Sequence, residues 1–182
     1  TREEGKPSFK LEQLTAANGL SHESAHDALS DVRATIALAR LIKDKQPKLW
    51  AHCLKLHKKQ AVIDEMGVGR PFVHLSGRYP VERGCLAVVW PLAPHPKFKN
   101  EIIVWDLAFD PSELFALDAR TVRERLFTGA DALPSGQTRL PIKTIHLNKS
   151  PIVIGNLKTL GSATARWGID LDQVQRHADV VE

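Results

Sequence analysis

The sequence predicts an α+β fold with three parts: a helical N-terminal segment, a small antiparallel β-barrel interrupted by helices, and a helical C-terminal segment. Three observations support this division. Apolar residues recur at helical spacing before residue 46, short apolar and β-branched runs bounded by turn residues follow from Phe72, and helix-capping residues return after Gly161. We therefore expect three segments, residues 1–46, 47–160 and 161–182.

Two helices are predicted in the N-terminal segment. The first covers residues 8–17 and ends at Asn18-Gly19, which suits a left-handed C-cap. The second begins after Asp27, a good N-cap, and continues to about Lys45, before Gln46-Pro47. One face of this helix carries an apolar stripe made of Val32, Ile36, Leu38, Ala39, Leu41 and Ile42.

The corner before the second helix carries a histidine and an aspartate. His26 lies just outside the helix and Asp31 about one turn inside it, so both side chains can face one cavity. A carboxylate can hold Mg²⁺, and an imidazole of pKa about 6.5 can accept a proton from an attacking water. Read without further context, the pair is more simply interpreted as a solvated first-turn acid and an ordinary loop histidine, so the spacing alone does not assign a catalytic role.

The middle segment begins with one predicted helix over residues 49–63, whose polar side is basic. Five strands follow, over residues 72–75, 85–90, 101–107, 140–147 and 152–154. Between the third and fourth strands, Asp110 and Asp118 each open a helical stretch, and the second ends at Phe127. Short strands with a helical insert indicate a small, strongly bent barrel, with Trp90 and Trp105 in its core.

The last segment is predicted to be helical. Ser162 caps a short helical turn that ends at Gly168, and either Asp170 or Asp172 opens a helix that is still running at Glu182.

The amino-acid composition limits the kinds of molecule that the chain is expected to bind. The chain is 43% hydrophobic and 25% charged, with a net charge of +4, which permits a polyanionic partner. No apolar run reaches the ~18 residues of a membrane span, and two isolated cysteines fit a reducing compartment. We therefore expect a cytoplasmic protein that does not enter membranes.

Several motifs together resemble the exodeoxyribonuclease I family, which belongs to the DEDDh 3′→5′ exonucleases. The resemblance follows nearly the whole chain in order, through residues 6–11, 14–19, 25–31, 72–77, 91–96, 120–128 and 141–151. It implies that residues 1–46 are the end of an RNase H-like exonuclease domain and residues 47–160 an SH3-like domain beside a DNA channel. Residues 161–182 would be the truncated start of a C-terminal helical domain.

The same resemblance implies an activity: degradation of single-stranded DNA to 5′-mononucleotides with two Mg²⁺ ions. His26 would be the general base and Asp31 the last metal-binding carboxylate. The family's other ligands include an Asp-x-Glu, which this sequence does not contain. Because two-metal chemistry needs both ions held, we expect this chain to be an internal piece of a longer bacterial enzyme and inactive alone.

DNA-facing residues are also implied by position in the resemblance: His52, Lys59, Asn100, Lys143 and Asn148. An outward strand lysine and a turn-forming asparagine are the plain alternatives for Lys143 and Asn148. Arg70 is a candidate for binding the acidic C-terminal tail of single-strand DNA-binding protein, which the family binds near this domain.

Three alternative functions compete with the nuclease. The first is a non-catalytic module that binds single-stranded DNA or an acidic peptide. An HD-type phosphohydrolase at His26-Asp27 conflicts with the β-rich middle, and a zinc site at His22 and His26 lacks a third ligand nearby. Without the rest of its domain, the apolar stripe of residues 1–46 would be exposed and could bind a second copy of the chain.

Overall fold

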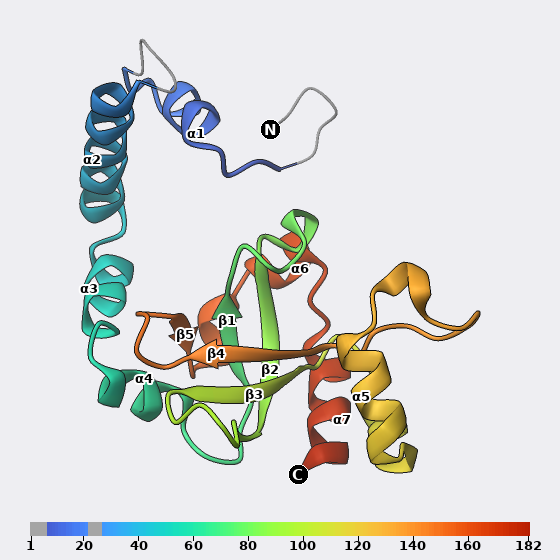
Figure 1. Ribbon diagram of the computed structural model, residues 1–182. Coiled ribbons are helices and arrows are strands. Elements are labelled where there is room, and N and C mark those ends of the chain that lie inside the picture. Colours follow the sequence, from blue (N-terminus) through green and yellow to red (C-terminus); the bar gives the residue numbers. More distant parts are fainter. Residues whose placement is uncertain (1–6, 22–26) are drawn as a thin grey trace.

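The computed structural model describes residues 7–21 and 27–182, and Figure 1 shows their arrangement. The N-terminal arm contains α1 (Leu11–Ala17) and α2 (Ala28–Lys45), which pack against each other. The Asp27 carboxylate accepts a hydrogen bond of 2.9 Å from the Ser30 amide, so the predicted N-cap is confirmed. Gly19 has a φ of +64°, as a left-handed C-terminal glycine requires. Figure 1 shows this arm standing away from the sheet.

The segment predicted as one helix over residues 49–63 is two helices, so that prediction is wrong. They are α3 (Pro47–Lys55) and α4 (Lys59–Met66). The chain leaves the first helix at Leu56, whose side chain is 1% exposed and joins the core beneath the sheet. A continuous helix would carry the chain onward in the direction of α3. The break after α3 lets the chain turn, so that Val62 and Met66 on α4 also reach that core. Tertiary packing here overrides helix periodicity.

All five predicted strands form. They are β1 (Phe72–Leu75), β2 (Leu86–Pro94), β3 (Glu101–Asp106), β4 (Ile142–His146) and β5 (Ile152–Ile154). The sheet is antiparallel throughout, in the order β4-β3-β2-β1-β5. Among the described residues no ladder joins β4 to β5, so the expected barrel is an open half-barrel with these two strands at its edges.

Both faces of the sheet are buried, and β2 shows why. Its residues 86–90 are all buried, and alternate side chains enter two different clusters. Ala87 and Val89 join the cluster that α4 covers, whereas Val88 and Trp90 join the cluster on the opposite face. Trp90 and Trp105 are 6% and 0% exposed, which confirms their burial, and both lie on this second face.

The second face is covered by helices that follow β3 and β5. The helical insert contains a 3₁₀ turn, η2 (Ser112–Ala116), α5 (Ala119–Phe127) and a second turn, η3 (Ala130–Ala132). The C-terminal part contains η4 (Leu157–Leu160), α6 (Ala163–Trp167) and α7 (Leu171–Val181). Asp118 caps α5, as predicted, and of the two candidates for α7, Asp170 and Asp172, it is Asp170 that caps the helix. Figure 1 shows α7 lying alongside the sheet, where its Val174 and Ala178 are buried in the second cluster.

The N-terminal arm differs from the sheet in its packing. Leu29, Val32 and Ile36 on α2 are 56%, 55% and 46% exposed. These residues are three and four positions apart, so they form one continuous apolar face on the helix. The stripe predicted from the sequence is therefore present, but its face is open to solvent at these positions.

Candidate nucleic-acid interface

Two of the predicted DNA-facing residues touch each other across the fold. The Lys59 ammonium, on the first residue of α4, donates a hydrogen bond of 2.7 Å to Oδ1 of Asn100, which precedes β3. Forty-one positions separate them in sequence. Both side chains are exposed, so the pair lies at the surface rather than in the core.

A third predicted residue lies beside this pair. The Leu147 amide donates a hydrogen bond of 2.8 Å to the Asn100 carbonyl, which continues the β3–β4 ladder by one step. Asn148 comes next and is exposed in the turn between β4 and β5, where Ser150 has a φ of +48°. We call Lys59, Asn100 and Asn148 the amide–lysine cluster. It presents one ammonium and two carboxamides, groups that bind phosphate oxygens and base edges.

His52 has a different setting. Its Nε2 lies 2.7 Å from the Val153 carbonyl, and because that oxygen can only accept, Nε2 carries the proton. This bond ties α3 to the edge strand β5. The half-buried imidazole therefore positions the helix, and only its uncovered part is left for a ligand.

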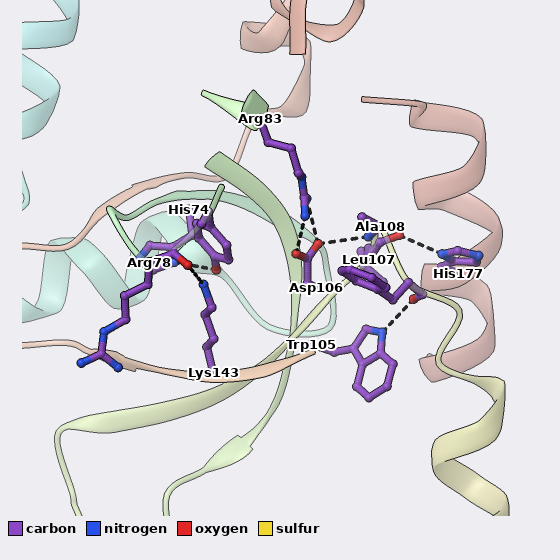
Figure 2. Close-up of polar contacts among 11 residues, drawn as sticks. His74, Arg78, Arg83, Trp105, Asp106, Leu107, Ala108, Lys143 and His177 are labelled. Carbon is purple, nitrogen blue, oxygen red and sulfur yellow. Dashed lines mark hydrogen bonds and ion pairs between the residues drawn. The ribbon is translucent and has the colours of Figure 1, made fainter. Parts of the chain in front are cut away.

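Lys143 lies over an aromatic ring. Its ammonium is 3.5 Å from the centroid of the Tyr79 ring and donates a hydrogen bond of 2.8 Å to the Arg78 carbonyl. Figure 2 shows it pointing into the loop that carries Arg78 and not along the strand. Burial, and to a lesser degree nearby arginines, lowers the pKa of Lys143, although Asp106 opposes that shift. The plain alternative of an outward strand lysine does not describe this half-buried position.

Beneath Lys143 lies a buried polar pair. Nδ1 of His74 and the Tyr79 hydroxyl are 3.0 Å apart, and both residues are almost fully buried. Burial, followed by the positive charge of Lys143, lowers the pKa of His74 to about 4. The ring is therefore neutral at physiological pH. Burial also raises the pKa of Tyr79, so the pair is a neutral hydrogen-bonded unit.

Two arginines near the sheet, Arg83 and Arg70, have hydrogen-bond partners within the fold. Arg83 makes a bidentate ion pair with the buried Asp106 at 2.8 and 3.0 Å, as Figure 2 shows. Arg70 donates hydrogen bonds of 3.3 and 3.2 Å to the carbonyls of Met66 and Glu65, and so closes the end of α4. The Arg70 side chain is nevertheless exposed.

The predicted catalytic pair is only partly visible. His26 lies outside the described residues, and Asp31 sits in the first turn of α2, as the sequence predicts. Within residues 7–21 and 27–182, no three His, Cys, Asp or Glu side chains gather where they could hold a metal ion. Asp31 supplies one carboxylate, and a hard divalent cation takes several oxygen ligands. The described residues alone therefore do not fit a two-metal centre.

The hairpin between β2 and β3 contributes residues that the linear sequence does not mark clearly. Lys97, Phe98 and Lys99 follow Pro96 and lead to Asn100, and all are exposed. A lysine–aromatic–lysine run inside a turn is the signal that could have identified them. Elsewhere the described chain holds no helix with both the length and the apolarity of a membrane crossing.

Comparison with known proteins gives one consistent result. The family model described as the Exonuclease I SH3-like domain matches residues 57–182. Exodeoxyribonuclease I of Escherichia coli is 45% identical over 154 residues, covering 83% of this chain and 32% of that protein. The Haemophilus influenzae protein of the same name is 44% identical, covering 92% and 36%. The chain thus spans about a third of the length of these relatives.

Solved structures agree with this fold. An exonuclease I from Methylocaldum szegediense superposes with a TM-score of 0.91 at 47% identity, covering 98% of this chain and 38% of that one. E. coli exonuclease I in complex with a dA16 oligonucleotide gives 0.92 at 38%, covering 99% and 39%. An ExoI/SSB-Ct complex gives 0.89 at 38%, covering 100% and 39%. Together with the half-barrel, these matches establish that the chain belongs to the Exonuclease I SH3-like domain family.

Proposed function

We propose that this chain is the DNA-guiding part of a 3′→5′ exonuclease that degrades single-stranded DNA to 5′-mononucleotides. The observation that carries the proposal is the amide–lysine cluster, in which residues from α4, the β2–β3 hairpin and the β4–β5 turn meet at one surface. A cationic group beside exposed amides suits a strand bound mainly through its backbone. The oligonucleotide complex of the E. coli relative supports the choice of ligand.

Binding of a labelled oligothymidylate tests this role directly. We expect the chain to bind it, and Lys59→Ala to weaken binding and to reduce the log–log salt slope by about 0.7. Lys43→Ala removes an exposed lysine from the arm and serves as the matched control. Absence of any binding by the unmodified chain, or equal effects of the two substitutions, would exclude the proposal.

We further propose that His26 is the general base and Asp31 a magnesium ligand of a nuclease centre completed by residues outside this chain. The position of Asp31 in a capped first turn supports this, since a rigid helix end fixes a carboxylate. The chain alone should then release no mononucleotides in magnesium buffer. Joined to the missing N-terminal part of the enzyme, it should gain activity that Asp31→Ala removes. Normal turnover in that variant would end the assignment.

A second ligand is supported by the ExoI/SSB-Ct complex among the relatives. We propose that the acidic C-terminal tail of single-strand DNA-binding protein binds near Arg70, whose exposed guanidinium lies at the end of α4. Fluorescence anisotropy of a labelled acidic tail peptide should show weaker binding to Arg70→Ala. We keep as the alternative function a non-catalytic module that binds single-stranded DNA or this peptide, ligands that are present in the complexes of the relatives.

The domain division and the location in a bacterial cytoplasm stay predictions. At the division near residue 160, α7 packs against β2 and the family model continues to residue 182. Residues 161–182 therefore share a core with the sheet, whichever domain they also introduce.

A further inference from the structure

The tip of the β2–β3 hairpin carries an exposed aromatic ring between two lysines. Phe98 is 55% exposed, and its neighbours Lys97 and Lys99 are exposed as well. A phenyl ring in water has no hydrogen bonds to make, so this ring offers an apolar surface of about the size of a nucleobase. The sequence shows that a phenylalanine lies between two lysines, but only the structure shows that its ring is exposed.

The hairpin tip has a defined shape. The His95 amide bonds to the Glu101 carbonyl and the Glu101 amide to the Phe98 carbonyl, each at 2.9 Å. Nδ1 of His95 accepts from the amides of Lys97 and Phe98, at 3.1 and 3.2 Å. The His95 and Phe98 rings lie 4.7 Å apart at 37°. The imidazole thus supports the phenyl ring from within the turn, so less side-chain freedom is lost when a ligand binds.

The ring lies next to the amide–lysine cluster. Phe98 is two residues before Asn100, which Lys59 holds at 2.7 Å. The surrounding segments, residues 55–60, 95–101 and 146–149, contain six lysines, and their one acid is Glu101. Its carboxylate lies 3.3 Å from Nδ1 of His146, so it is directed toward a neighbouring side chain of the sheet. The surface is therefore cationic on both sides of the ring.

We propose that Phe98 stacks on an unpaired base of a single DNA strand while Lys97 and Lys99 contact the flanking phosphates. The inference deepens the proposed function and rests on it. Stacking on an aromatic ring tolerates any base, since every base has a π-face, and it requires that the base be unpaired. The hairpin tip would then select single strands over duplex without selecting sequence, and extend the bound strand beyond the amide–lysine cluster.

The test measures binding of a labelled oligothymidylate to the chain and to two Phe98 variants. Phe98→Ala should weaken binding roughly 5- to 150-fold, the range of one base–aromatic stack. Phe98→Tyr keeps a ring and should bind like the unmodified chain. Phe115→Ala is the matched control, because Phe115 is 67% exposed but lies on η2, away from the hairpin. Equal binding by Phe98→Ala and the unmodified chain would overturn the inference.

Binding to a DNA strand with abasic sites separates the contribution of base stacking from that of the phosphate contacts. The chain and Phe98→Ala should bind an abasic strand equally, since neither has a base to stack on. The salt slope should be unchanged in Phe98→Ala and fall by about 0.7 in Lys99→Gln. Loss of DNA binding in Lys59→Ala but not in Phe98→Ala would overturn only this inference, whereas no binding by the unmodified chain would overturn the proposed function too. A Phe98→Ala defect confined to the acidic tail peptide would make the ring a protein-binding site and overturn the inference.

Discussion

The sheet and the N-terminal arm differ in how their apolar side chains are covered. The sheet covers both of its faces with helices of this chain, and its strand β2 is buried along residues 86–90. On the arm, α2 leaves Leu29, Val32 and Ile36 about half exposed. In both regions the helices form where local sequence predicts them, with an aspartate N-cap and an apolar periodicity in each. The difference lies in what covers them: within the described residues, the apolar face of α2 stays about half exposed at these three positions, whereas both faces of the sheet are buried.

Removing a large core side chain sharpens this comparison most. Trp105 is fully buried, and its Nε1 donates a hydrogen bond of 2.8 Å to the Phe109 carbonyl. Trp105→Ala should lower the free energy of unfolding by about 3–5 kcal/mol, because it leaves a cavity. Urea denaturation followed by circular dichroism measures this value. Leu29→Ala on the arm is the control and should change it by less than ~0.5 kcal/mol; similar losses would remove the distinction.

Acid should weaken the sheet through His74. Its pKa is 6.5 when unfolded and about 4 when folded, so the unfolded state binds the extra proton. Stability is therefore complete above pH 6.5 and is lost as the pH falls toward 4, by up to about 3 kcal/mol. Urea titrations across this range measure the loss. His74→Asn can keep a polar partner for Tyr79 without titrating, and its curve should be flatter; an unchanged slope would contradict the assignment.

Helix caps test how each region responds to a small local loss. Asp27→Ala and Asp170→Ala each remove a side-chain acceptor at a helix start, at a cost of about 1 kcal/mol. Because α7 is packed on the sheet, the second substitution should lower the global melting temperature. The first should speed amide exchange in α2 and leave global melting nearly unchanged. Equal effects on melting would show that the arm and the sheet unfold as one unit.

The smallest effect on stability is expected at the exposed stripe. Val32→Glu together with Ile36→Glu should alter the free energy of unfolding by less than ~0.5 kcal/mol, because both side chains are already about half exposed. If this face joins two copies of the chain, the substitutions should remove any dimer seen by sedimentation velocity. Dimers that persist unchanged in the double variant would place self-association elsewhere.

Local signals predicted the elements well because they depend on near neighbours. Asp27 and Asp118 cap the helices that the sequence assigns to them, and Asp170 is one of the two caps that it offers for α7. The helix predicted across residues 49–63 failed because burial of Leu56 depends on strands that come later in the chain. The strongly bent antiparallel sheet was predicted, but its form as an open half-barrel was not, since the sequence does not record whether β4 and β5 meet.

The candidate site also has a part that local sequence predicts and a part that only the fold reveals. Sequence resemblance selected Lys59, Asn100 and Asn148, but only the fold joins Lys59 to Asn100, through a hydrogen bond that spans 41 positions. The β3–β4 pairing of Leu147 with Asn100 then brings the neighbouring Asn148 to the same edge. The resemblance also assigned Lys143 and Arg70 to ligands, whereas the structure shows each donating first to backbone carbonyls. Whether those cations also meet ligands depends on charge left exposed, which no linear pattern records.

The sequence by itself determined the α+β class, the strand and cap positions, and the family to which this chain belongs. Tertiary structure alone decided which apolar faces are covered, where α3 ends, and that Phe98 is exposed beside the amide–lysine cluster. The reason is the separation in sequence over which each kind of interaction acts. Caps, turns and periodicity act between residues a few positions apart, while burial and site assembly depend on contacts whose partners are distant in the chain.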